Sequence, residues 1–185
     1  AHLKLIQYLQ NKNPNVPGIA DKIEAPISRN IERVRKYWKL IIQVDPSIRD
    51  IYGDISLVDE SISVDHFVPW QYVAHDELWN LHPTTKSINS SKSNSLPSWN
   101  RYFEMLGNLE YHAYDLKSKN ELILNEFNKI APYHLNNQEI KNQLYEDGLD
   151  KERFIERLEH VIRPVYESAQ TLGFKEWVYH GSDNL

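Results

Sequence analysis

Residues 62–69, which read ISVDHFVP, and residues 80–97, which read NLHPTTKSINSSKSNSLP, decide the fold of this chain. The first stretch closes a longer segment, residues 49–67, in which apolar and polar residues alternate on either side of an acidic step at residues 59–60. Alternation with a period of two, interrupted by a polar bend, is typical of two antiparallel strands. Residues 49–67 are therefore predicted to form a β-hairpin.

The second stretch completes a polar loop and carries a short helix. From Trp70 onward the chain is rich in serine, asparagine and threonine, which predicts a loop with at most one helical turn at residues 76–79. A short helix is expected over residues 87–94, and Leu96-Pro97 ends it. The predicted local order is hairpin, polar loop and short helix.

Helices are expected on both sides of this segment. Apolar residues at spacings of three and four predict a helix over residues 28–43. The fold class is therefore predicted as α+β, mainly helical, with a small ββα module embedded between helices. Further amphipathic helices are expected at residues 98–116, 119–130, 137–147 and 151–172. The predicted organisation is a helical segment with a basic face (1–48), the ββα module (49–97) and a C-terminal helical segment (98–185).

Length and composition exclude several classes of protein. With 185 residues and no cysteine, the chain has room for one domain and no means of forming a disulfide, a thiolate nucleophile or a Cys-ligated zinc site. No apolar run approaches the length of a membrane span, so a cytoplasmic protein without membrane contact is expected. The sequence starts at Ala1 without a methionine, which makes a larger parent polypeptide one expectation. A homodimer is a separate expectation.

The charge is segregated along the chain. Residues 1–49 carry nine Lys/Arg and four Asp/Glu, whereas residues 50–77 carry seven acidic residues and no basic one. One interpretation is a solvated basic helix face beside an acidic hairpin. The other is that the acids hold a cation while the bases contact a nucleic-acid backbone, as a metal-dependent phosphodiesterase requires.

Asp65 and His66 are the first candidates for chemistry, because they are adjacent at the end of a predicted strand. Neighbouring side chains on a strand point to opposite faces, so these two cannot act as adjacent ligands of one cation. They suggest divided roles, in which one group holds a metal and the other acts as a general base. Taken alone, an Asp-His pair is equally compatible with an ordinary surface or core position.

The joint pattern of four polar positions resembles the HNH endonuclease family. Asp65-His66 lies at a strand end, Asn80 follows His66 by 14 positions, and Asn89 follows Asn80 by nine. Lys92 follows Asn89 by three, as a lysine does in the HNH module of the RNA-guided CRISPR nuclease, which has the same spacings. The resemblance covers about residues 50–97.

This resemblance implies a role for each position. Asp65 and Asn89 would be the metal ligands, and His66 the general base that deprotonates the attacking water. Asn80 would hydrogen-bond across the loop and orient His66, while Lys92 would stabilise the negative charge of the phosphate in the transition state. Individually, the two asparagines and the lysine also fit a turn, a helix terminus and a solvated side chain.

The implied cofactor is Mg²⁺, with Mn²⁺ able to substitute, because carboxylate and amide oxygens are hard ligands. Other family members have a histidine ligand where this chain has Asn89, which moves the expectation away from zinc. Many relatives also hold a structural zinc with two CxxC pairs, and none is expected in a chain without cysteine.

The implied partner is DNA, hydrolysed at a phosphodiester bond. Arg29, Arg33 and Lys36, at spacings of three and four on the predicted helix 28–43, are the candidate contacts to the nucleic-acid backbone, together with Lys86. Two alternatives remain: a catalytically inactive HNH fold that serves as a nucleic-acid-binding or regulatory subunit, and a nuclease that cleaves RNA.

Overall fold

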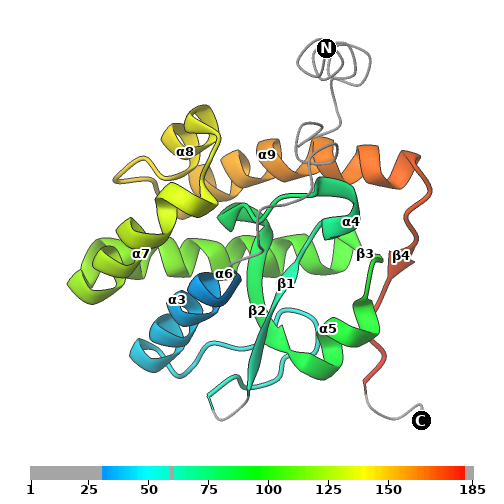
Figure 1. Cartoon of the computed structure of the whole chain (residues 1–185), viewed down its shortest axis with the longest axis horizontal. Helices are drawn as coiled ribbons and strands as arrows, with labels where there is room; N and C mark the ends of the chain where they lie inside the picture. The colour runs from blue at the N-terminus through cyan, green and yellow to red at the C-terminus, as the bar shows by residue number, and fades with distance from the viewer. Residues whose placement is uncertain (1–30, 59–60, 182–185) are drawn as a thin grey trace, which may run out of the picture.

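A computed structural model describes residues 31–58 and 61–181 of the chain (Figure 1). Helices dominate, and the sheet content is one antiparallel and one parallel pair of short strands among these residues, which confirms the mainly helical α+β class. The elements are α3 (Ile31–Val44), β1 (Ile62–His66), α4 (Trp70–Val73), the 3-10 helix η1 (Leu78–Asn80), β2 (Leu81–Thr85), α5 (Lys86–Lys92), β3 (Leu96–Pro97), α6 (Trp99–Lys119), α7 (Glu121–His134), α8 (Gln138–Leu144), α9 (Lys151–Thr171) and β4 (Glu176–Trp177).

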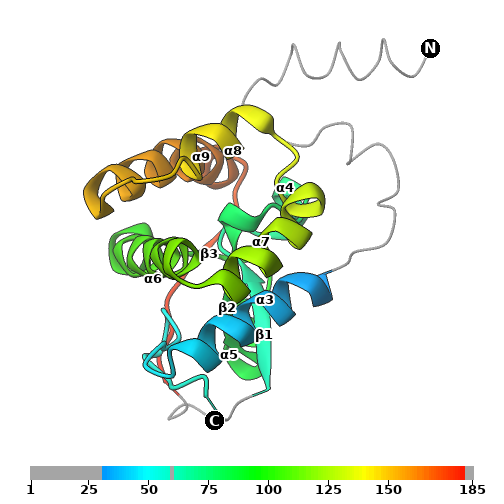
Figure 2. The same cartoon turned by 90° about the vertical axis from the view of Figure 1, so that its left-hand side faces the viewer.

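The centre of the fold is a hairpin followed by a helix. Strands β1 and β2 pair antiparallel, with Asp65 opposite His82 and His66 opposite Leu81, and α5 follows β2 directly. Figures 1 and 2 show α3 and α5 on opposite sides of this hairpin. From the α3 side, the indole N–H of Trp38 donates to the carbonyl of Leu81 at 3.1 Å. The hairpin is thus held between two helices.

The prediction of a β-hairpin over residues 49–67 is wrong. Residues 49–58 form turns with an isolated bridge between Arg49 and Ser56, and β1 pairs instead with β2, in the stretch predicted to be a loop. That loop also contains α4 and η1, where at most one helical turn was expected.

The position of Pro83 in the ladder explains how a strand can form where the sequence predicted a loop. Proline has no N–H, so within a strand it normally argues against sheet pairing. At the end of the ladder, Phe67 N donates to Asn80 O at 2.9 Å, and hydrogen-bonded pairs alternate along an antiparallel ladder. The Val64–Pro83 pair falls between bonded pairs, so the missing N–H costs β2 no ladder hydrogen bond.

The C-terminal helices form one core with the hairpin region, and all four expected helices are confirmed with shifted ends. The long helices α6 and α9 pack against each other, and α7 packs on α3 (Figure 2). Gly107 permits the close approach of α6 to α9, because a Cβ at this position would lie 3.1 Å from side-chain carbons of Ile155. None of the described helices is long and apolar enough to cross a lipid bilayer.

A short parallel pairing attaches the C-terminal segment to the exit of α5. Leu96 pairs with Glu176 and Pro97 with Trp177, and the hydroxyl of Tyr166 in α9 donates to the Pro97 carbonyl at 3.0 Å. The strands β3 and β4 therefore join the end of the ββα unit to the last part of the chain that the structure describes.

Helix α7, which supports the hairpin region through α3, begins at a side-chain cap. The Asn120 side chain accepts hydrogen bonds from the backbone N–H groups of Leu122 and Ile123. Asn120→Ala is expected to lower the free energy of unfolding by about 1 kcal/mol, because these N–H groups lose their acceptor. Chemical denaturation measures the change. Asn125→Ala, at an exposed position inside the same helix, is the control and should leave stability nearly unchanged.

Candidate active site

A cavity of about 260 Å³ opens where β1 ends, beside the start of α3, the start of α4 and the second half of α5. It brings together three of the residues predicted from the sequence: Asp65, His66 and Asn89. The lining residues are Ile31, Val64, Asp65, His66, Pro69, Trp70, Asn89, Ser93 and Asn94. Asp65 and His66 are the two ionisable side chains among these lining residues.

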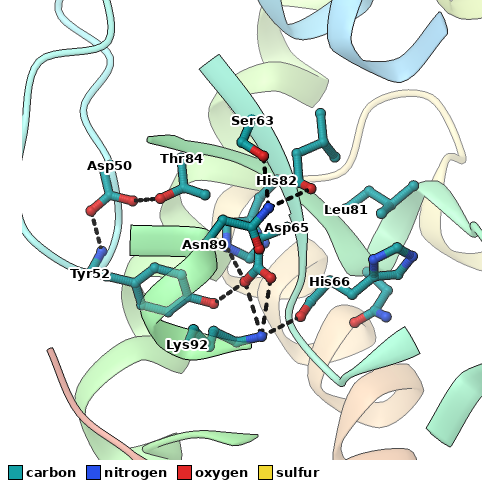
Figure 3. A network of polar contacts seen from close by, with 12 residues as sticks. Asp50, Tyr52, Ser63, Asp65, His66, Leu81, His82, Thr84, Asn89 and Lys92 are labelled. Atoms are coloured by element: carbon teal, nitrogen blue, oxygen red, sulfur yellow. Dashed lines mark hydrogen bonds and ion pairs between the residues drawn. The ribbon is translucent and has the colours of Figure 1, made fainter. Parts of the chain in front are cut away.

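Asp65 is a buried carboxylate held by two neighbours, Tyr52 and Lys92 (Figure 3). Its Oδ2 accepts a hydrogen bond from the Tyr52 hydroxyl at 2.8 Å, and the ammonium of Lys92 lies 3.1 Å from both carboxylate oxygens. Each carboxylate oxygen has more than one lone pair, so these contacts orient Asp65 and leave acceptor capacity toward the cavity.

Lys92 lies behind Asp65. Its side chain is fully buried, and Nζ also donates to the backbone carbonyl of His66 at 2.7 Å (Figure 3). Burial lowers the pKa of Lys92, and the carboxylate of Asp65 opposes that shift. The sequence analysis expected Lys92 to contact phosphate, whereas its fully buried side chain contacts the end of β1 and the carboxylate of Asp65.

Asn89 is positioned by helix α5 and by β1. The helix is capped by Thr85, whose hydroxyl accepts from Ile88 N at 3.2 Å. The Nδ2 group of Asn89 donates to Ser63 Oγ at 2.7 Å and to the Val64 carbonyl at 3.3 Å. Since the amide nitrogen is used in this way, the amide oxygen turns toward the carboxylate of Asp65 (Figure 3).

The oxygens of Asp65 and Asn89 therefore converge from a strand and a helix. A carboxylate and an amide oxygen are hard donors, and this pair fits Mg²⁺ or Mn²⁺ better than zinc. No cluster of three or more His, Asp or Glu side chains suited to a metal occurs in residues 31–58 and 61–181. A cation at this site would complete its coordination with water or substrate oxygens.

His82 is the cross-strand neighbour of Asp65 and is fully buried. Burial lowers its pKa to about 4, so the imidazole is neutral at physiological pH. Its Nε2 is 3.6 Å from Asp65 Oδ2, and neither ring nitrogen has a hydrogen-bond partner among the described residues. His82 thus adds no positive charge beside Asp65.

Tyr52 is a site residue that the sequence analysis missed. Its backbone N–H donates to Asp50 Oδ2 at 2.9 Å, and the other oxygen of Asp50 accepts from Thr84 Oγ1 at 2.5 Å (Figure 3). Burial raises the pKa of Asp50. This network places the Tyr52 hydroxyl on Asp65, and no sequence pattern signals it, since the turn at residues 49–58 was taken for a strand.

His66 is paired with a residue that the sequence analysis left without a role. Its Nε2 lies 2.8 Å from Oδ1 of Asp76, which belongs to the segment between α4 and η1. The only available signal was an acidic residue in the polar loop ten positions after His66.

Asn80 braces the loop through hydrogen bonds to Val68. It is fully buried; its Oδ1 accepts from Val68 N at 2.8 Å, and its Nδ2 donates to the Val68 carbonyl at 2.9 Å. Val68 follows His66 by two residues, so Asn80 fixes the backbone that leaves the strand. Its effect on the imidazole is indirect.

The candidate nucleic-acid contacts are spread over two helices. On α3, the guanidinium of Arg33 stacks over the ring of Tyr133 at 4.0 Å, and Lys36 is exposed. Lys86 is exposed at the first position of α5. Arg29 lies outside the described residues.

Comparisons with known proteins bear on the same segment. The sequence model of the family described as HNH endonuclease matches residues 51–98. No curated protein and no solved structure matches the chain. The match covers the hairpin, both short helices between its strands, α5 and the lining residues Asp65, His66 and Asn89. The part of this chain that is similar to the HNH endonuclease family is therefore residues 51–98, which include the cavity-lining residues Asp65, His66 and Asn89.

Proposed function

We propose that this protein is a metal-dependent endonuclease that hydrolyses DNA phosphodiester bonds at the cavity formed by β1, α4 and α5. One observation carries the proposal: Asp65, His66 and Asn89 line a single cavity, within the segment that matches the HNH endonuclease family. An acid-base group and two oxygen ligands side by side are what hydrolysis of a phosphodiester by an activated water requires.

His66 is the general base. A carboxylate only accepts hydrogen bonds, so contact with ionised Asp76 places the proton of the neutral ring on Nε2. Nδ1 then carries the lone pair that takes a proton from the attacking water. The imidazole lines the cavity, whereas Asp76 contacts it from the loop side.

Asp65 and Asn89 are the residues that would hold the cation. When bound, Mg²⁺ supplies Lewis-acid stabilisation of the phosphate and leaving-group oxygens. Lys92 and Tyr52 keep the Asp65 carboxylate in one orientation, and Ser63 does the same for the amide of Asn89. These contacts hold both side chains in one rotamer, so their oxygens are already positioned before a cation binds.

Binding of the DNA backbone is assigned to the exposed lysines Lys36 and Lys86. Arg33 in α3 and Arg29, which precedes α3 in the sequence, are assigned the same role. Lysine and arginine contacts to phosphate are independent of sequence and weaken as salt concentration rises. We therefore expect cleavage that depends little on the base sequence of the DNA.

The decisive test compares wild type with His66→Ala on supercoiled plasmid in Mg²⁺, Mn²⁺ or EDTA. We expect metal-dependent nicking by the wild type and a rate lower by about 10²- to 10⁴-fold in His66→Ala, because the general base is lost. Gel separation of supercoiled, nicked and linear forms gives the rates.

His112→Ala is the matched control, because His112 forms a comparable pair with Asp45 at 2.6 Å, remote from the lining residues of the cavity. It should nick at the wild-type rate. Retention of DNA without cleavage under either metal would instead identify a binding module. A parallel assay on RNA distinguishes the two backbones.

A further inference from the structure

The loop between α4 and η1 contacts two parts of the molecule that are far apart in sequence. On one side, Asp76 Oδ1 is 2.8 Å from Nε2 of His66. On the other, the backbone carbonyl of Asp76 accepts a hydrogen bond from Nδ1 of His134, the last residue of α7, at 2.7 Å. One residue therefore connects the cavity with the C-terminal helices.

The next residue strengthens this connection. The carboxylate of Glu77 is buried and accepts from the backbone N–H of Asn136 at 3.0 Å and from its Nδ2 at 2.8 Å. Burial raises the pKa of Glu77, and the hydrogen bonds from Asn136 oppose that shift. The segment that carries Asp76 is thus fixed to the end of α7 by both a backbone and a side-chain contact.

We propose that Asp76 is a positioning residue that fixes the tautomer and orientation of His66, and that the end of α7 holds Asp76 in place. This inference rests on the proposed function, in which His66 is the base. The carboxylate retains the Nε2 proton, so that Nδ1 remains the basic nitrogen. It also balances the positive charge that the ring acquires when it takes a proton from water.

The contacts with the end of α7 hold the loop that carries Asp76 in a fixed position. A loop of polar residues is a poor support for a catalytic group unless other contacts lock it, and this chain has no cysteine for a zinc site beside the hairpin. His134, the last residue of α7, and Asn136, just after this helix, supply those contacts from outside residues 51–98. The C-terminal helices then determine the geometry of the base.

The test uses the full chain with Asp76→Ala and Asp76→Asn. Both substitutions are expected to lower the rate constant for nicking by about 10²-fold, with unchanged Mn²⁺ affinity and unchanged DNA binding. Asp76→Asn retains the side-chain volume, so a loss in this variant is due to the missing carboxylate. Asp45→Asn, which alters the surface pair with His112, is the matched control and should nick normally.

A second readout does not depend on activity. In ¹⁵N NMR of the metal-free protein, the ring signals of His66 are identified among the eight histidines by their absence in His66→Ala. The wild type should show the Nε2–H tautomer, and Asp76→Ala should show a mixture of tautomers. His134→Ala should shift the signals in the same direction by a smaller amount.

Identical His66 signals in wild type and Asp76→Ala, or unchanged nicking in both Asp76 variants, would overturn the inference. If the wild type does not nick DNA but the tautomer still depends on Asp76, the positioning role stands and the nuclease assignment fails.

Discussion

Asp65→Asn is expected to abolish metal-dependent nicking and to destabilise the protein by about 3–5 kcal/mol, because the substitution removes a proposed metal ligand and also leaves a buried ammonium without its counter-charge. Lys92 is fully buried, with Nζ 3.1 Å from the Asp65 carboxylate. For a domain of this size the stability change corresponds to a fall in melting temperature of roughly 10 °C. Circular dichroism, Mn²⁺ titration and plasmid nicking measure the three effects.

The double variant Asp65→Asn, Lys92→Met separates the two causes. With the buried charge removed, the melting temperature should recover most of its loss, since an apolar side chain of similar length replaces the unpaired ammonium. Nicking and Mn²⁺ binding should remain absent. Recovery of activity in the double variant would show that Asp65 serves only to neutralise Lys92.

Asp147→Asn is the control for removing an acidic partner of a buried lysine. Lys117 is also buried, but its partner Asp147 is exposed and 3.9 Å away. A solvent-exposed carboxylate contributes little to stability. This variant should therefore melt and nick like the wild type.

The second large effect concerns Glu110, a carboxyl buried in α6 far from the cavity in sequence. Its Oε1 has no hydrogen-bond partner among the described residues, and burial raises its pKa well above the usual 4.5. Because the folded state favours the protonated form, its contribution to stability is complete below pH 4.5. That contribution is lost as the pH rises toward the folded-state value.

The expected slope is a loss of up to about 1.4 kcal/mol per pH unit above pH 4.5 from this group. Glu110→Gln carries no ionisable proton, so it should be more stable than wild type at pH 8 and nearly equal to it at pH 4.5. Urea denaturation across this range gives the slopes. Glu77 and Asp50, whose pKa values burial also raises, add slopes of the same sign that remain in the variant.

Glu104→Gln provides the comparison on the same helix. Glu104 is exposed, so its substitution should leave the pH dependence of stability unchanged. Equal pH slopes in wild type and Glu110→Gln would contradict the account given for Glu110.

The sequence predicted the helical flanks well, because long amphipathic helices carry a strong period of about 3.6. It failed on the hairpin, because β2 contains Pro83 and reads LHPTT, without the alternation that marks a strand. Only the pairing with β1 makes this segment a strand. Residues 49–58, which precede β1, do alternate between apolar and polar residues. In the structure they nevertheless form turns around the buried Asp50.

For the site, the resemblance to the HNH family singled out Asp65, His66 and Asn89, and the structure places all three around one cavity. The metal ligation and base chemistry assigned to them stay predictions. The partners that orient them were not predictable, because Tyr52, Asp76 and His134 act through tertiary contacts with no fixed spacing to the motif. Lys92 was placed in the right neighbourhood, but its burial beneath Asp65 depends on packing that a local pattern does not encode.

The pairing of β3 with β4, and the contacts of Asp76 and Glu77 with the end of α7, have a consequence for synthesis on the ribosome. The motif from Asp65 to Asn89 leaves the exit tunnel long before His134, Asn136 and Trp177. Contacts of such large sequence separation form late and slow the folding of a chain. A nascent chain that exposes the whole motif therefore still lacks the contacts that hold it in place. The candidate site is complete only after residues 134–136 and 176–177 have been translated.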